Sequence, residues 1–244
     1  MGAQGSDGTR EATPVWVAVP AAGSGARMGA GIPKQYLPLA GKPLAEHTLA
    51  ALLAVAQLRE TVVAIAPGDP HWPALAPALR ARVRVVDGGA TRAASVANAL
   101  RGFSRRPDPG DWVLVHDMAR PCVRPGRIAA MLRELDADPV GGLLALPLAD
   151  TLKRADAAQR VAATVPRDAL WRAQTPQVFR FALLERALDE ALASGEEITD
   201  EAMAIERLGL QPRLLPGSED NIKVTRPEDL ALAEYHLARQ GAQS

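Results

Sequence analysis

Two positively charged side chains lie close together in a glycine-rich segment of the chain. Residues 20–35 read P-A-A-G-S-G-A-R-M-G-A-G-I-P-K-Q and directly follow the apolar run 15–19. Backbone N–H groups in a glycine-rich turn after a buried strand can bind phosphate oxygens. Arg27 and Lys34 add fixed positive charge to this turn, and Pro33 stiffens the approach to Lys34. The segment therefore predicts a loop that binds a polyphosphate and stabilises moving charge; the alternative is an ordinary turn with two surface cations.

Two common phosphate-binding motifs fit this segment poorly. Gly23 and Gly25 match the first two glycines of the dinucleotide-binding motif G-x-G-x-x-G, but Met28 stands at the third position. The second expected strand, 61–66, also ends without the acidic residue that this motif requires. The sequence contains no Gly-Lys-Ser or Gly-Lys-Thr, which a P-loop needs. The predicted phosphate loop therefore belongs to neither of these types.

The composition limits the partners of the chain. Its 28 basic and 28 acidic residues balance, so no net field attracts it to nucleic acid or to a membrane surface. A single cysteine excludes an intramolecular disulfide and a multi-cysteine zinc site. Residues 1–13 are polar and lack the apolar core of a secretory signal, and no apolar run reaches the roughly 18 residues of a membrane span. We expect a disordered tail over 1–13, a cytoplasmic location, and neither nucleic acid nor membrane as a partner.

Apolar runs typical of short buried strands alternate with helical patterns over the first part of the chain. The expected strands are 16–19, 61–66, 83–86, 112–116 and 142–146, and the expected helices are 43–57, 73–80, 92–103 and 125–135. This alternation predicts an α/β fold with a Rossmann-like, mainly parallel sheet sandwiched by helices. Because ligands bind at the carboxyl ends of the strands in such sheets, polar residues that follow strands are candidate site residues.

The segment D-G-G-A-T-R-A-A-S follows the third expected strand. Its paired glycines, which include Gly89, allow the backbone to approach a ligand closely. Thr91 or Ser95 would then contact a base or a ribose. An ordinary turn with Thr91 as a helix cap explains the same residues equally well.

Asp117 follows the fourth expected strand. A carboxylate at the end of a strand beside a phosphate loop is suited to Mg²⁺, which binds oxygen ligands and substrate phosphates. Asp117 is alternatively a helix cap or the ionic partner of Arg120. We expect the neighbouring His116 to be a structural residue at the strand end rather than a catalyst.

The pattern changes after Pro147. Residues 148–154 and 161–165 are predicted to form two extended arms of a β-hairpin. Because a lone two-stranded ribbon is marginally stable in water, the hairpin is expected to protrude and to lie on a second subunit. We therefore expect one domain over 14–240, with 148–172 as a dimerisation arm. The remaining expected elements are helices over 180–193, from about 198, and over 226–239, and a short strand over 213–216.

Taken together, these segments resemble the 2-C-methyl-D-erythritol 4-phosphate cytidylyltransferases, within the wider group of sugar-nucleotide nucleotidyltransferases. The matching segments are 20–35, 87–95, 116–121 (H-D-x-A-R-P), 150–154 (D-T-x-K), 174–177 (x-T-P-Q), 198–202 (I-T-D-E-A) and 221–229 (N-x-K-V-T-x-P-E-D). The glycine-rich segment alone indicates only the wider group. The motifs D-T-x-K, T-P-Q and N-x-K-V-T narrow the resemblance to the cytidylyltransferase branch.

The resemblance implies a nucleotide-diphospho-sugar transferase fold and a CMP transfer from CTP to 2-C-methyl-D-erythritol 4-phosphate. The products are 4-diphosphocytidyl-2-C-methyl-D-erythritol and pyrophosphate, in the non-mevalonate isoprenoid pathway, with Mg²⁺ as the cofactor. The implied catalytic residues are Arg27, Lys34 and Lys223, and Asp117 is the implied metal ligand. The implied nucleotide-binding residues are Pro20, Ala21, Ala22, Gly23, Gly25, Gly89 and Ser95. The implied acceptor-binding residues are Arg120, Thr151, Arg167, Thr175 and Thr199.

In the family the hairpin arm clasps a second subunit and completes its substrate site. The resemblance therefore implies a homodimer in which Thr151 and Arg167 act across the interface. Two other functions remain open at this point. A cytidylyltransferase for another polyol phosphate, such as ribitol 5-phosphate, would share the glycine-rich segment and Lys223. A nucleotide-binding regulator without turnover would keep the fold, but the presence of Arg27, Lys34 and Lys223 argues against it.

Overall fold

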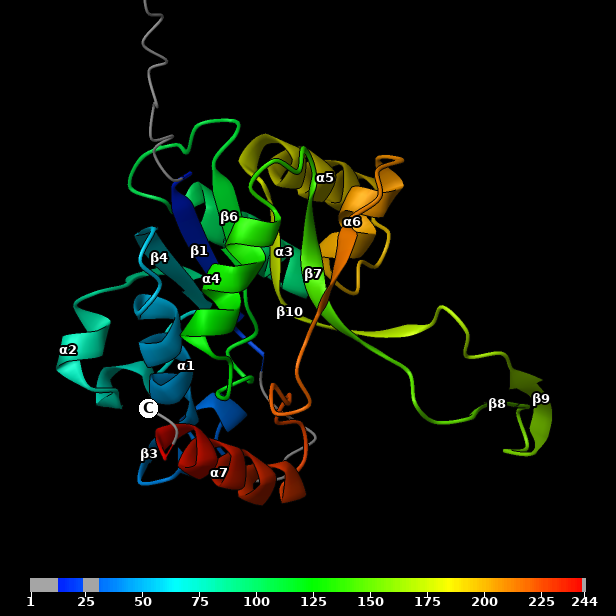
Figure 1. The fold of residues 1–244 in the computed structure, drawn as a ribbon. Helices are drawn as coiled ribbons and strands as arrows, with labels where there is room; N and C mark the ends of the chain where they lie inside the picture. Colours follow the sequence, from blue (N-terminus) through cyan, green and yellow to red (C-terminus); the bar gives the residue numbers. More distant parts are fainter. Residues whose placement is uncertain (1–12, 24–30, 243–244) are drawn as a thin grey trace, which may run out of the picture.

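A seven-stranded sheet forms the centre of the computed structural model, which describes residues 13–23 and 31–242 (Figure 1). The strand order is β11-β7-β10-β6-β1-β4-β5. The strands are β1 (Val15–Ala21), β4 (Leu58–Ile65), β5 (Arg84–Asp87), β6 (Trp112–Val115), β7 (Gly141–Pro147), β10 (Trp171–Arg180) and β11 (Arg213–Pro216). All five strands expected over the first part of the chain are present, and so is the short late strand.

The sheet is mainly parallel, as expected. β1 pairs in parallel with both β4 and β6, β4 with β5, and β11 with β7. The exception is β10, which runs antiparallel to β6 and β7. From the sequence, residues 171–177 are expected only to connect the arm back to the domain, so β10 is not among the expected strands. The first three residues of β10 are exposed, which explains why the continuous apolar pattern of a buried strand is absent there.

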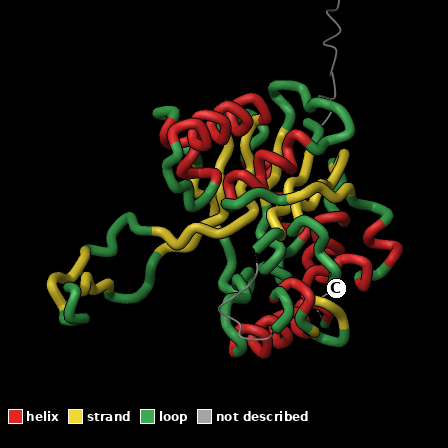
Figure 2. The backbone as a smooth tube through the Cα atoms, turned by 180° about the vertical axis from the view of Figure 1, so that it is seen from behind, coloured by secondary structure: helices red, strands yellow, loops and turns green. Residues whose placement is uncertain are grey.

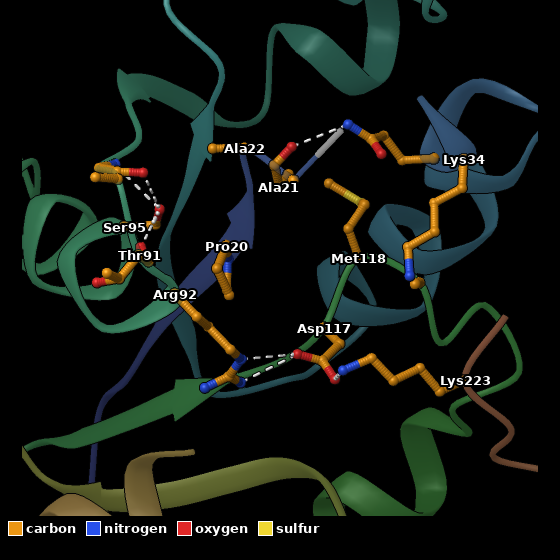
Figure 3. Close-up of a pocket in the computed structure, with 15 residues that line it drawn as sticks. Pro20, Ala21, Ala22, Lys34, Thr91, Arg92, Ser95, Asp117, Met118 and Lys223 are labelled. Carbon is orange, nitrogen blue, oxygen red and sulfur yellow. Dashed lines mark hydrogen bonds and ion pairs between the residues drawn. The ribbon is translucent and has the colours of Figure 1, made fainter. Parts of the chain in front are cut away.

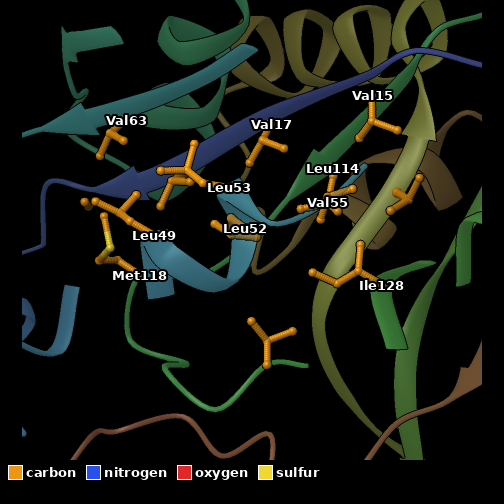
Figure 4. Close-up of a cluster of buried hydrophobic side chains, with 14 of the residues drawn as sticks. Val15, Val17, Leu49, Leu52, Leu53, Val55, Val63, Leu114, Met118 and Ile128 are labelled. Atoms are coloured by element: carbon orange, nitrogen blue, oxygen red, sulfur yellow. The ribbon is translucent and has the colours of Figure 1, made fainter. Parts of the chain in front are cut away.

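Helices cover both faces of the sheet because successive strand residues point to opposite sides. Val15, Val17 and Val19 of β1 face α1 (Leu44–Leu53) and α4 (Pro125–Glu134). Figure 4 shows Leu49, Leu52 and Leu53 of α1 packed beneath the strands of this face. The intervening residues of β1, Trp16 and Ala18, face α3 (Arg92–Arg101), α5 (Phe181–Ser194) and α6 (Glu201–Arg207). The predicted sandwich is confirmed.

The prediction of one continuous helix over residues 73–80 is wrong. Residues 73–80 form a short 3₁₀ turn, η3 (Trp72–Ala74), and the single-turn helix α2 (Pro77–Arg80). Ala76 between them is extended, with φ −50° and ψ 123°. The cause is Pro77, because the ring of a proline disfavours helical backbone at the preceding residue.

The chain between β7 and β10 leaves the body of the molecule. It forms a second sheet of two antiparallel strands, β8 (Leu152–Ala155) and β9 (Val161–Val165). Figures 1 and 2 show this hairpin at the tip of a long extension that projects from the sheet. Its side chains are largely exposed, and Val161 is 66% exposed. The predicted protruding hairpin is confirmed, whereas its role in dimerisation stays a prediction.

The last helix, α7 (Glu228–Gly241), packs on the small hairpin of β2 (Pro38–Leu39) and β3 (Lys42–Pro43). A third apolar cluster, which includes Leu39, Val224 and Ala233, joins these elements. This cluster holds the segment before α7, which includes Val224, against the β2–β3 hairpin, which includes Leu39. Among the residues that the structure describes, no helix has the length and apolar character needed to span a membrane.

Candidate active site

The candidate site lies where the strand order reverses. From β1 the chain continues to β4 and β5 on one side, whereas β6 pairs with the other side of β1. At such a switch point the loops after neighbouring parallel strands diverge and leave a crevice for a ligand. A pocket of about 260 Å³ opens there, and we call it the switch-point pocket (Figure 3). Its lining comprises Pro20, Ala21, Ala22, Gly23, Lys34, Gln35, Gly89, Ala90, Thr91, Arg92, Ser95, Asp117, Met118, Ala119 and Lys223.

The structure brings most of the sequence-predicted residues together in this pocket. Six of the seven nucleotide-binding candidates are described, and all six line the pocket. Four lie at the end of β1, one follows β5 and one lies in α3: Pro20, Ala21, Ala22, Gly23, Gly89 and Ser95. Lys34, Asp117 and Lys223 line it as well. Gly25 and Arg27 lie outside the described residues, so their predicted roles stay predictions.

The turn after β5 requires glycine because alanine side chains and nearby backbone approach it closely. A Cβ atom on Gly88 would lie 2.4 Å from the Cβ of Ala22, and one on Gly89 would lie 2.4 Å from the Cβ of Ala94. The Ser95 hydroxyl holds this turn: it accepts a hydrogen bond from the Gly89 N–H (3.0 Å) and donates to the Thr91 carbonyl (2.9 Å). The Thr91 hydroxyl accepts from the Ala94 N–H at 3.1 Å, which confirms the helix-cap alternative for this residue.

Lys34 and Gln35 connect the glycine-rich segment to the rest of the site. Both lie in the 3₁₀ turn η2 (Lys34–Tyr36). The Gln35 amide donates to the Ala21 carbonyl at 2.9 Å, so it ties the end of this segment to the end of β1. The Lys34 ammonium donates to the Val224 carbonyl at 3.0 Å, next to Lys223. The two lysines predicted to be catalytic are thus brought together although they are far apart in the sequence.

Asp117 is the centre of a cluster of charges. Its Oδ1 lies 3.0 Å from Nη2 of Arg92, and its Oδ2 lies 2.8 Å from Nζ of Lys223 (Figure 3). Oδ2 also lies 3.6 Å from Nε of Arg120, so the predicted pairing of Asp117 with Arg120 is present. Burial alone would raise the pKa of the Asp117 carboxyl, but the surrounding cations hold this pKa well below its usual range. Asp117 is therefore ionised at neutral pH.

His116 and Thr175 fix the backbone beneath Asp117. Nε2 of His116 donates to the Arg120 carbonyl (3.1 Å), because a carbonyl oxygen can only accept. Nδ1 then accepts from the Thr175 hydroxyl (3.0 Å), whose oxygen accepts from the Asp117 N–H (3.0 Å). Complete burial lowers the pKa of His116 to about 4, so the imidazole is neutral at pH 7. The structure agrees with the expectation that His116 is structural.

The segment that carries Lys223, residues 217–225, is held by hydrogen bonds to buried residues. Nη1 of Arg120 donates to the Asn221 carbonyl at 2.7 Å, and the Asn221 amide donates to the Thr175 carbonyl at 2.8 Å. The Val224 N–H donates to the Ala119 carbonyl at 2.8 Å. Arg120 and Thr175 are thus buried beside the pocket, and their roles in acceptor binding stay predictions.

The other predicted acceptor-binding residues lie away from the switch-point pocket of their own chain. Thr151 and Arg167 belong to the projecting arm, where both are exposed and Arg167 contacts the Ala149 carbonyl. Thr199 is exposed just before α6. Within one chain, the structure does not bring these three residues to the pocket.

Two charged residues of the site are absent from the sequence predictions. Arg92, the first residue of α3, contacts Glu201, the first residue of α6, as well as Asp117. Burial raises the pKa of the Glu201 carboxyl, although the Arg92 guanidinium opposes this effect. Both residues stand in motifs that carry the family resemblance, D-G-G-x-x-R and I-T-D-E-A. The sequence therefore contains both residues within recognisable motifs, but the spacing of these motifs does not indicate that the two side chains form an ion pair.

The donor set of the pocket is compatible with a magnesium ion held mainly by substrate. The described residues include no group of three or more His, Cys, Asp or Glu side chains that would form a protein-only metal site. Mg²⁺ is commonly bound through one or two carboxylates together with phosphate oxygens. Asp117 supplies one ionised carboxylate in a pocket that also holds two lysines. Both of its oxygens face cations, so a metal ion would have to displace one of them.

Comparison with known proteins identifies the family. The family described as 2-C-methyl-D-erythritol 4-phosphate cytidylyltransferase (IspD) matches residues 15–239. A protein of this name from an Azoarcus species is 54% identical over 224 residues, which cover 90% of this chain and 92% of that protein. One from Dechloromonas aromatica is 55% identical over 221 residues, which cover 90% and 95%. The crystal structure of the protein of this name from Thermus thermophilus is 36% identical, with a TM-score of 0.76, and the match covers 93% of this chain and 100% of that chain.

The fold and the site together define a nucleotidyltransferase of the nucleotide-diphospho-sugar transferase type. The structure contributes the mainly parallel sheet and the pocket at its switch point, which holds Lys34 and Lys223. Within this class, the chain belongs to the 2-C-methyl-D-erythritol 4-phosphate cytidylyltransferase family.

Proposed function

We propose that this protein transfers CMP from CTP to 2-C-methyl-D-erythritol 4-phosphate, releasing pyrophosphate in the non-mevalonate isoprenoid pathway. The observation that carries this proposal is the meeting of Lys34, Lys223 and Asp117 at the switch point, beside glycines that follow β1 and β5. Family membership and the names of the relatives support both substrates. We also propose a cytoplasmic location, which is consistent with the supply of CTP and with a single, buried, unpaired cysteine.

The reaction requires little from the protein beyond positioning and charge. A phosphate oxygen of the acceptor attacks the α-phosphorus of CTP, and the bond from that phosphorus to the oxygen of pyrophosphate breaks. Because the attacking phosphate is already anionic, no strong general base is needed. We assign Lys34, Lys223 and Arg27 to the triphosphate and to the negative charge that grows on its oxygens during transfer. Ion pairing with Asp117 holds the Lys223 ammonium at the pocket.

We propose Asp117 as the protein ligand of Mg²⁺, with the triphosphate supplying the other anionic oxygens. When bound, the ion supplies positive charge that neutralises the triphosphate. Metal binding would require one Asp117 oxygen to separate from the cation that it contacts. The depressed pKa of Asp117 supports this role, since the carboxylate is ionised at neutral pH.

Pyrophosphate release tests the proposed acceptor. With CTP and Mg²⁺ present, we expect rapid release with 2-C-methyl-D-erythritol 4-phosphate and at most slow release with ribitol 5-phosphate. Coupled phosphate detection after pyrophosphatase measures both rates. A higher rate with ribitol 5-phosphate would favour the other polyol phosphate cytidylyltransferase, and no release with any acceptor or nucleotide would favour a non-catalytic regulator.

We propose that the protein is a homodimer in which each arm completes the partner's acceptor site. The support is structural: Thr151 and Arg167 lie on the arm, which projects from the sheet (Figure 2), has no apolar core of its own and contributes no residue to the pocket lining of its chain. A two-stranded ribbon of this kind is marginal unless it packs on another surface. A two-fold symmetric pair would supply that surface and would place these residues where the acceptor binds.

Mixing two inactive variants tests this arrangement. Arg167→Ala removes the arm cation, and Lys223→Ala removes the pocket cation. If the arm acts on its partner, one site of each mixed dimer keeps both residues, so an equal mixture should recover about a quarter of the unaltered activity. Pyrophosphate release after co-refolding measures this recovery, and each variant refolded alone serves as the control. If both residues acted within one chain, the mixture would stay inactive.

A further inference from the structure

We infer that Glu201 is a positioning residue that strengthens binding of the divalent cation, by holding Arg92 and compensating its charge beside Asp117. The inference rests on the proposed metal role of Asp117. Glu201 begins α6 and its side chain is 1% exposed. A carboxylate at such depth is costly unless it is paired, and the proposed transfer reaction gives it no task.

Arg92 joins Glu201 to Asp117. Its Nη1 contacts Oε1 of Glu201, while its Nη2 and Nε lie 3.0 and 3.3 Å from Oδ1 of Asp117. A guanidinium is planar and presents its N–H donors in a fixed fork. The contact with Glu201 therefore determines which edge of Arg92 faces Asp117. One cation thus connects the N-terminus of α6 with the loop after β6.

The charges around Asp117 explain why a second carboxylate matters. Arg92, Arg120 and Lys223 all lie within 3.6 Å of the Asp117 oxygens, so three cations face one anion. A metal cation that approaches this carboxylate is repelled by the excess positive charge. Among the described residues, Glu201 is the other acidic side chain that forms an ion pair with a member of this cluster.

Glu201 also has an unused acceptor. Its Oε2 is buried and has no hydrogen-bond partner within the described part of the chain. When Asp117 turns an oxygen toward a metal ion, this atom offers Arg92 a second carboxylate oxygen in place of the one it loses. Glu201 therefore lowers the cost of separating Arg92 from Asp117, and metal binding at Asp117 becomes easier.

Direct measurement of metal binding tests this role. The probe is Mn²⁺, followed through the EPR signal of the free ion, with the protein saturated with the α,β-methylene analogue of CTP. We expect Glu201→Gln and Glu201→Met to weaken Mn²⁺ binding by about tenfold, the lower end of the range for partners of a metal ligand. Glu206→Gln makes the same change at an exposed position of α6 and should leave binding unchanged.

The outcomes separate this inference from the proposal on which it rests. If Asp117→Asn binds Mn²⁺ as the unaltered protein does, the metal role of Asp117 is wrong. If Asp117→Asn weakens binding but the folded Glu201→Gln protein binds as tightly as the unaltered one, the positioning role of Glu201 is wrong. Failure of both Glu201 variants to fold, judged by circular dichroism, would also overturn it, because Glu201 would then be a structural residue.

Discussion

Replacing Lys223 with alanine is expected to lower turnover by at least about a hundredfold, the scale for losing one donor to transition-state charge. The Lys223 side chain is 38% exposed, and its ammonium pairs with Asp117. Residues 217–225, which carry Lys223, are held in place by hydrogen bonds that do not involve this side chain. The Val224 N–H bonds to the Ala119 carbonyl, and the Asn221 amide bonds to the Thr175 carbonyl. The variant should therefore fold normally and lose the charge that the reaction needs.

Steady-state pyrophosphate release and urea unfolding measure the two parts of this prediction. Lys42→Ala is the matched control, because it removes an exposed lysine that lies outside the pocket lining. We expect the control to keep both its activity and its stability. Unchanged turnover in Lys223→Ala, with the protein folded, would remove Lys223 from the proposed mechanism.

Replacing Asp117 with asparagine is expected to affect both stability and activity. The change leaves Arg92, Arg120 and Lys223 facing one another without the carboxylate that they share. Loss of one partner from a buried ionic cluster typically costs about 3 kcal/mol of unfolding free energy. Turnover should fall by at least about a hundredfold, because Lys223 loses its anchor and the proposed metal loses its ligand.

The acid dependence of stability follows from the depressed pKa of Asp117. A carboxyl whose pKa is lower in the folded than in the unfolded protein stabilises the fold above its unfolded pKa, about 3.9. This contribution decreases as the pH falls from there toward the folded pKa. The difference in unfolding free energy between Asp117→Asn and the unaltered protein should thus be full near pH 7 and should narrow below about pH 4.

Urea denaturation near pH 7 and below about pH 4 measures the difference in unfolding free energy between Asp117→Asn and the unaltered protein. Asp189→Asn is the control, since Asp189 pairs with Arg101 at the surface, where both side chains are more than half exposed. That change should cost at most about 1 kcal/mol at either pH. An Asp117→Asn protein as stable as the control at pH 7 would show that the charge cluster contributes little to folding.

The sequence predicted the parts of the fold that depend on local patterns. Strand and helix periodicity predicted the parallel sheet, and the position of Asp117 after a strand predicted its place at the sheet edge. β10 was missed because its exposed first residues break the apolar run, and its direction is set by pairing with β6 and β7. The break before Pro77 was predictable from the proline itself.

The charge cluster could not be predicted in the same way. Arg92 and Glu201 are 109 residues apart, and neither follows a pattern that indicates its partner. Their pairing depends on how α3 and α6 pack on one face of the sheet. The buried path from His116 through Thr175 to Asp117 likewise depends on β10, which the sequence patterns did not indicate.

The bond from Lys34 to the Val224 carbonyl has a consequence for how the protein is made. Synthesis proceeds from the N-terminus, and domains begin to fold as they emerge. Strands β1, β4, β5 and β6 can pair while residues 217–225 are still missing, so a growing chain can reach much of its sheet first. It cannot yet hold Lys34 in place or present Lys223 beside Asp117. A chain that ends before residue 217 therefore lacks the contacts that hold Lys34 and that present Lys223 to Asp117, so the last part of the chain to be synthesised completes the site.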